Sequence, residues 1–130
     1  MKYLLDTHLL LWACVNPGAL PNGVPQIING DGELYFSAMS IWEIGIKRAL
    51  NRPDFMYDPG VIRTALLGAG YIELSMTSEH AIAASSLPAI HGDPFDRALI
   101  GQAQVEGMML ITHDSTIQGY STYAAIHYFP

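Results

Sequence analysis

Short hydrophobic segments alternate with longer amphipathic stretches along this 130-residue chain. The hydrophobic segments suit strands, and the stretches between them carry apolar residues at helical spacing. Strands that alternate with helices predict a mostly parallel sheet with helices on both faces. We therefore predict an α/β fold, a three-layer α/β/α sandwich with a central, mostly parallel sheet, formed as a single domain over residues 1–130.

The predicted strands are Lys2–Leu5, Leu34–Ser37, Tyr71–Leu74, Met108–Thr112 and Ala125–Tyr128. The predicted helices are Thr7–Val15, Val24–Asn29, Ala38–Leu50, Pro59–Ala69, Ser78–Leu87 and Pro94–Glu106. The glycines expected to end three of these helices are Gly30, Gly70 and Gly107.

Composition limits the classes of protein to consider. Half of the residues are hydrophobic and 14% are charged, which argues for a folded globular chain and against disorder. Cys14 is the single cysteine, so an internal disulfide is impossible and a reducing, cytoplasmic setting is expected. The apolar start of the chain faintly resembles a signal peptide, but Asp6 and His8 interrupt it and no Ala-x-Ala-like site follows. No apolar run reaches the roughly 18 residues that a membrane span needs.

Four carboxylates stand where a predicted strand gives way to a helix, or on the helix that follows. They are Asp6, Glu43, Asp96 and Asp114. In an open α/β sheet, the carboxyl ends of the strands form one edge, and ligand sites lie along that edge. Acids gathered there repel each other, so the pattern predicts a divalent cation among them. The sequence therefore favours a metal-dependent enzyme that cleaves phosphodiesters.

Each acid also has a local explanation. Asp6 can cap the helix that it precedes, and Glu43 can pair with Lys47 one turn later. Asp93 is a predicted N-cap, with Asp96 as the N3 acid of a capping box, and Asp114 can cap the short helix that follows it. None of these explanations predicts that four acids share one edge of a sheet, whereas a metal site does.

The helix predicted over Ala38–Leu50 has a broad apolar arc. Its members are Ile41, Trp42, Ile46, Ala49 and Leu50. Glu43 falls just beyond the edge of this arc and Lys47 lies further into the polar side. We therefore expect Glu43 to be half sheltered, where a carboxylate can hold a metal ion or a water molecule.

The residue types favour magnesium over zinc, because carboxylate oxygens suit Mg²⁺ whereas histidine and cysteine favour Zn²⁺. The histidines show no zinc spacing and have no partner cysteines: His8, His80, His91, His113 and His127. Among them, His91 and His113 stand beside the acids and are candidates to touch a substrate.

The net charge of −6 argues against a nucleic-acid partner, because such proteins usually carry a basic patch. A cation bound among the acids would offset part of this charge. Lys47, Arg48 and Arg52 are three of only six basic residues and lie close together. They can complement a helix dipole or contact phosphates, and both interpretations stay open.

Four segments carry a family resemblance: MKYLLDTH at 1–8, SAMSIWEI at 37–44, HGDPFDR at 91–97 and LITHD at 110–114. In order, spacing and strand context they resemble the motif series of PIN-domain proteins over nearly the whole chain. The resemblance is strongest to the VapC-type toxins of bacterial toxin–antitoxin pairs. It implies a PIN-like fold and Mg²⁺- or Mn²⁺-dependent cleavage of RNA.

The resemblance also implies roles for the four acids. Asp6, Glu43, Asp96 and Asp114 would be the catalytic residues. Asp6, Asp96 and Asp114 would hold the metal, and Glu43 would orient or deprotonate the attacking water.

The resemblance and the basic residues together suggest binding partners. Thr112 matches a polar position of the family, and we expect Thr112, Lys47 and Arg48 to bind the RNA substrate. A cognate antitoxin protein would inhibit the enzyme. We also expect a homodimer, because the segment Leu9–Val15 is apolar nearly all round and a short surface helix cannot bury every face in its own core.

Two alternatives stay open from the sequence. The chain could be a PIN-like binding or scaffold module without catalysis, or a structure-specific DNA nuclease of the same fold. A phosphatase is a weaker alternative, because Asp6-Thr7-His8 lacks the second aspartate that haloacid-type phosphatases use.

Overall fold

The computed structural model describes residues 1–130 and contains one parallel five-stranded sheet in the order β3-β2-β1-β4-β5. The strands are β1 (Lys2–Leu5), β2 (Glu33–Ser37), β3 (Ile72–Leu74), β4 (Met109–Thr112) and β5 (Ile126–Tyr128). The helices are α1 (Thr7–Val15), α2 (Val24–Ile28), α3 (Ala38–Ala49), α4 (Pro59–Gly68), α5 (Ser78–Ser85) and α6 (Pro94–Glu106). Two 3-10 helices complete the list, η1 (Pro17–Ala19) and η2 (Ser115–Tyr120). The predicted α/β fold is confirmed, with element boundaries that shift by at most two residues.

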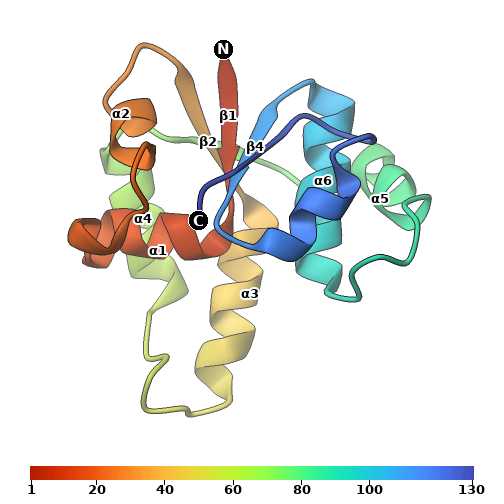
Figure 1. The fold of residues 1–130 in the computed structure, drawn as a ribbon. Helices are drawn as coiled ribbons and strands as arrows, with labels where there is room; N and C mark the ends of the chain where they lie inside the picture. The colour runs from red at the N-terminus through yellow and green to blue at the C-terminus, as the bar shows by residue number, and fades with distance from the viewer.

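Helices cover both faces of the sheet, as the three-layer prediction requires (Figure 1). Helices α1, α2 and α4 lie on one side of the central strands, and α5 and α6 lie on the other. Helix α3 continues from the end of β2 beyond the edge of the sheet. No helix is both long enough and apolar enough to span a bilayer.

The strands contribute side chains to two separate hydrophobic cores, because neighbouring residues of a strand point to opposite faces of the sheet. Leu5 and Ile111 pack in the core beneath α1 and α4. Leu4 and Leu110 pack in the core beneath α6. All four side chains are fully buried. This explains why the strands are apolar at consecutive positions, as expected for a parallel sheet covered on both faces.

Helix α1 is buried by its own chain, which corrects the argument that its apolar surface needs a second copy. Leu9 and Leu10 are fully buried and Leu11 is 4% exposed. The helix contacts α3, α4 and η1 in addition to the sheet. Trp12 is half-buried, and among the hydrophobic residues of the helix only Val15 at its end exposes a large part of its side chain.

Helix α3 turns its polar residues Ser40 and Glu43 towards the protein, and much of its apolar arc is exposed. Its buried residues are Ser40, Glu43 and Ile44. The side chains of Trp42, Ile46 and Leu50 are 59%, 38% and 57% exposed. The orientation follows from Thr7, whose Oγ1 lies 2.7 Å from Glu43 Oε1 and 2.9 Å from Ser40 Oγ. Glu43 is therefore buried and not half sheltered.

The strand order determines where a ligand can bind. The chain moves outward from β1 through β2 to β3 and then returns to the other side of β1 with β4. Ligands of open α/β sheets bind outside the carboxyl ends of the strands where the order changes direction. Asp6 follows β1 and Asp114 lies just after β4, so both acids stand at this point.

Helix α6 approaches α5 closely because Gly101 has no side chain. A Cβ at this position would lie 2.8 Å from the backbone nitrogen of Ala84 and 2.9 Å from the carbonyl oxygen of His80. Gly107 ends α6 in the left-handed conformation, with φ of 66°, as its position in the sequence predicts. The position of α6 matters because Asp96 lies in its first turn.

Candidate active site

The four predicted acids line one small cavity at the carboxyl edge of the sheet. Its volume is about 140 Å³. It is lined by Asp6, Thr7, His8, Glu43, Lys47, Asp93, Asp96 and Asp114. Five carboxylates therefore face one ammonium group, and no hydrophobic residue lines the space. All four acids predicted from distant segments are brought together here.

Asp6 is almost completely buried and is held by three hydrogen-bond donors. Its Oδ1 accepts from the backbone N–H of Leu9 at 3.0 Å. Its Oδ2 accepts from the Thr112 hydroxyl at 2.6 Å and from the backbone N–H of His113 at 2.9 Å. Burial raises the pKa of Asp6, and these hydrogen bonds oppose that rise. The carboxylate is thus fixed in one orientation beside the cavity.

Thr112 joins two of the acids and does not reach the surface. Its hydroxyl donates to Asp6 and accepts from the backbone N–H of Asp114 at 2.9 Å. The residue has no exposed surface, so it cannot touch RNA directly. The structure therefore corrects the expected substrate contact and gives Thr112 the role of positioning Asp6 and Asp114.

Glu43 is held between two partners, one on each carboxylate oxygen. Oε1 accepts from the Thr7 hydroxyl at 2.7 Å, and Oε2 lies 2.9 Å from Lys47 Nζ. Lys47 lines the cavity, as a residue that contacts substrate should. Arg48 does not line it, because its guanidinium pairs with Asp58 at 2.9 Å. The structure thus brings only the first of these two basic residues to the site.

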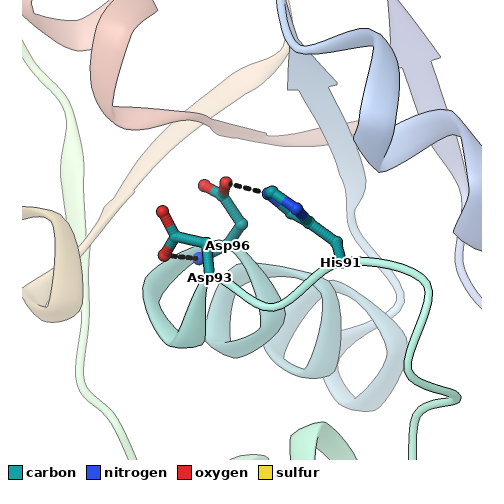
Figure 2. Close-up of side chains that lie close together, drawn as sticks. All are labelled: His91, Asp93 and Asp96. Atoms are coloured by element: carbon teal, nitrogen blue, oxygen red, sulfur yellow. Dashed lines mark hydrogen bonds and ion pairs between the residues drawn. The ribbon is translucent and has the colours of Figure 1, made fainter.

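Asp93 and Asp96 have separate roles at the start of α6. Asp93 is the predicted N-cap, and its Oδ1 accepts from the backbone N–H groups of Phe95 and Asp96. The expected capping box is absent, since Asp96 turns its Oδ2 to His91 Nε2 at 2.7 Å (Figure 2). Burial is the largest cause that raises the pKa of Asp96 to about 6, and the charges of Asp93 and Glu43 raise it further.

His91, a candidate substrate contact from its position in the sequence, lies beside the acids in the structure. Its Nε2 lies between two carboxylates, 2.7 Å from Asp96 Oδ2 and 3.6 Å from Asp114 Oδ2. Ligand atoms of His91, Asp93 and Asp96 all lie within 4.8 Å of one another. No three of the four predicted acids meet that spacing. The sequence feature that could have identified His91 as a site residue is its position in the block His91–Arg97, just before Asp93 and Asp96.

A second polar cavity of about 320 Å³ adjoins the first and shares Asp6, His8 and Asp114 with it. His113 and Ser115 complete its lining. The Trp12 ring lies beside it, with its centroid 5.6 Å from the His8 ring and 5.2 Å from the His113 ring. The acids therefore open onto a polar surface with an aromatic flank.

The largest cavity in the protein, about 540 Å³, lies elsewhere. It is mainly apolar and is lined by residues of α1, α2 and α4, with no carboxylate. The buried hydroxyl of Tyr71 in its wall has no hydrogen-bond partner, and burial raises the pKa of Tyr71 to about 12. Its lining has no acid or base that could serve hydrolysis, so the smaller acidic cavity is the candidate active site.

Comparison with known proteins agrees with this fold. No curated protein sequence matches the chain. Its structure is similar to VapBC2 from Rickettsia felis bound to a promoter DNA fragment, with a TM-score of 0.68, 12% identity and 100% of each chain covered. It is also similar to VapBC-1 from nontypeable Haemophilus influenzae, with a TM-score of 0.66, 18% identity and 98% of each chain covered. A third similar structure is FitAcB from Neisseria gonorrhoeae, with a TM-score of 0.60, 15% identity and 96% of each chain covered.

At these identities the structural likeness concerns the fold. The family assignment comes from the sequence, since the PIN domain model matches residues 3–121, which include all four predicted acids. The acidic cavity at the carboxyl ends of β1 and β4 lies within the matched region. This chain belongs to the PIN-domain family.

Proposed function

We propose that this chain is a single-domain, metal-dependent endoribonuclease, the toxin of a toxin–antitoxin pair. The observation that carries the proposal is the acidic cavity, where five carboxylates from four segments of the chain face one ammonium group. Membership of the PIN-domain family supports it, as does the fold shared with VapBC proteins.

The carboxylate oxygens and the excess negative charge around the cavity suit a divalent cation. Asp6, Asp96 and Asp114 would hold it through carboxylate oxygens, the ligands that Mg²⁺ and Mn²⁺ accept. Burial raises the pKa of Asp96, the negative charges of Asp93 and Glu43 raise it further, and a bound cation would relieve their repulsion. Such a cation stabilises charge on a phosphate and lowers the pKa of a bound water.

The chain's own residues have separate tasks in this proposal. Glu43 is oriented by Thr7 and Lys47 and would accept the proton of the attacking water. Lys47, which lines the cavity, would contact a phosphate of the RNA through its ammonium group. His113, which lines the adjoining polar cavity, would contact the neighbouring nucleotide.

Protein partners are part of the proposal. VapBC-5 from Mycobacterium tuberculosis, with a similar fold, is a member of a family of toxin–antitoxin systems, and we propose a cognate antitoxin for this chain too. We further propose a homodimer that forms through the exposed apolar face of α3, defined by Trp42, Ile46 and Leu50. The single free cysteine, Cys14, agrees with action in a reducing cytoplasm.

The test is cleavage of matched substrates by the purified protein with Mg²⁺ or Mn²⁺. Single-stranded and stem-loop RNA should be cut, and cleavage should stop when the metal is chelated. Asp114→Asn should lower the cleavage rate by orders of magnitude, since one metal ligand is lost while the cap on Thr116 is retained. Cleavage of DNA flaps alone would favour the DNA nuclease. Metal binding without any cleavage would favour the scaffold.

A further inference from the structure

The His91 ring is placed among the acids at a spacing that suits a shared cation. Two ligands at right angles on an ion, each at about 2.1 Å, lie about 3.0 Å apart. The separation of His91 Nε2 from Asp96 Oδ2, 2.7 Å, is close to that value, and ligand atoms of His91, Asp93 and Asp96 all lie within 4.8 Å of one another. Figure 2 shows the imidazole in this position, with its edge turned to the Asp96 carboxylate.

The backbone that carries His91 is anchored by a buried tyrosine. The Tyr120 hydroxyl accepts from the backbone N–H of Ile90 at 3.2 Å and of His91 at 2.8 Å. It also donates to the carbonyl oxygen of Pro88 at 2.8 Å. Tyr120 is fully buried in the core beneath α6, so the loop is tied to the rigid part of the protein.

The guanidinium of Arg97 also holds this loop, and its Nη1 lies 3.2 Å from the Tyr120 hydroxyl. Its Nη1 donates to the carbonyl oxygens of Pro88 and His91 at 3.0 and 3.3 Å. Its Nη2 donates to those of Ala84 and Leu87 at 3.2 and 2.9 Å. Both the N–H and the C=O of His91 are thus occupied. A surface histidine needs no such support, and a ligand that must hold its position does.

We propose that His91 Nε2 is a ligand of the same cation as Asp96, and that this nitrogen makes the site prefer Mn²⁺ to Mg²⁺. This role rests on the proposed metal-dependent function of the same site. Mg²⁺ strongly prefers oxygen ligands, whereas imidazole suits first-row transition metals. Carboxylates bind Mn²⁺ as well as Mg²⁺, so a single nitrogen ligand among the oxygens gives the site a higher affinity for Mn²⁺ than for Mg²⁺. Arg97 and Tyr120 are then positioning residues.

Mn²⁺ bound to the full chain without RNA provides the test. Pulsed electron paramagnetic resonance should detect ¹⁴N coupling to the bound Mn²⁺, and calorimetry should give tighter binding of Mn²⁺ than of Mg²⁺. His91→Ala should abolish the coupling and weaken Mn²⁺ binding on the order of tenfold or more, with a smaller effect on Mg²⁺. His91→Gln, which keeps a hydrogen-bond donor for Asp96, should give the same result. His127→Ala removes an exposed histidine of β5 that does not line the site, and should change neither measurement.

Two results would overturn the role of His91 and leave the proposed nuclease standing. One is Mn²⁺ that binds without nitrogen coupling. The other is coupling and affinity that persist in both His91 variants, which would mean that a different nitrogen is bound. Failure of the wild-type protein to bind either ion would overturn the His91 role and the metal-dependent function together. RNA cleavage, measured separately, shows which of the two proposals has failed.

Discussion

The acids of the site differ in how tightly the protein holds them, and this decides which substitutions are informative. The Asp6 carboxylate accepts hydrogen bonds from three donors. In Asp6→Asn the side-chain NH₂ group would face one of these donors, and that hydrogen bond would be lost. The Asp96 side chain accepts a hydrogen bond only from His91, and the Asp114 side chain accepts one only from Thr116. The amide oxygen of an asparagine can accept either hydrogen bond. Variants of Asp96 and Asp114 therefore separate catalysis from folding better than variants of Asp6.

Asp96→Asn should stabilise the metal-free protein at about pH 7.5 by on the order of 1 kcal/mol. Because the pKa of Asp96 is raised from 3.8 to about 6 in the folded state, the folded protein takes up this proton more readily than the unfolded chain. Protonation of Asp96 therefore contributes to the stability of the wild type. This contribution is fully present below pH 3.8 and is lost as the pH rises through about 6. The advantage of the variant should therefore shrink towards about pH 4, as measured by chemical denaturation in a chelator. A difference that does not change with pH would contradict this cause.

Asp93→Ala supplies the contrast at the neighbouring aspartate. Asp93 caps α6 through two backbone N–H groups, so its loss should cost about 1 kcal/mol of unfolding free energy. RNA cleavage should fall only in part, because Asp93 is not one of the proposed metal ligands. An inactive but fully stable Asp93→Ala would show that the roles of Asp93 and Asp96 have been exchanged.

Thr112→Val should destabilise the protein by about 1–3 kcal/mol, because it leaves buried polar groups of Asp6 and Asp114 without their partner. It should also weaken metal binding, since it removes the hydrogen bond that opposes the raised pKa of Asp6. Thr112→Ser keeps the hydroxyl and is the matched control. Equal Mn²⁺ affinity and equal stability of the two variants would show that the hydroxyl does not position Asp6.

The sequence was sufficient to select four of the acids that line the cavity, because three lie at a strand end or on the helix that follows and Asp96 lies in the block His91–Arg97. It could not predict their partners. The hydrogen bond from Thr112 to Asp6 joins residues 106 positions apart, and only the pairing of β1 with β4 brings them together. The spacing that suggested a capping box at Asp96 was equally compatible with its contact to His91.

At the scale of elements, periodicity predicted where helices lie more reliably than which face they bury. A helix that is apolar all round is usually buried, and α1 follows that rule. In α3 the buried stripe includes Ser40 and Glu43, because this face points at the carboxyl edge of the sheet. The requirement for a polar site outweighed the burial of Trp42 and Leu50, and composition alone does not reveal such a requirement.

The loop Pro88–His91 gives a prediction about an element without regular structure. Tyr120→Phe removes the hydroxyl that binds the backbone of Pro88, Ile90 and His91. We expect a loss of about 1–3 kcal/mol in stability. We also expect Mn²⁺ affinity to fall, by less than in His91→Ala, because the ring is retained but less well positioned. Denaturation and calorimetry measure the two effects, and unchanged Mn²⁺ affinity despite lower stability would limit Tyr120 to a folding role.

At the scale of the whole molecule, the largest exposed apolar side chains of α3 lie on one helix face. Leu50→Lys and Trp42→Glu should convert a dimer into a monomer at tens of micromolar, because a charge in an apolar interface remains unpaired. Val15→Lys changes an equally exposed apolar residue on α1 and should leave the dimer intact. Sedimentation velocity distinguishes these cases. A wild-type monomer at this concentration would contradict the proposed dimer.

The most direct test of the account is single-turnover RNA cleavage by four versions of the purified protein. Wild type with Mn²⁺ should cut RNA, and Asp96→Asn and Asp114→Asn should each be slower by several orders of magnitude while remaining folded. Asp58→Asn removes an acid of equal charge that caps α4 and does not line the cavity, and it should cleave like wild type. Unchanged cleavage in both cavity variants, or none by the metal-loaded wild type, would contradict the assignment of this cavity as the active site of a ribonuclease.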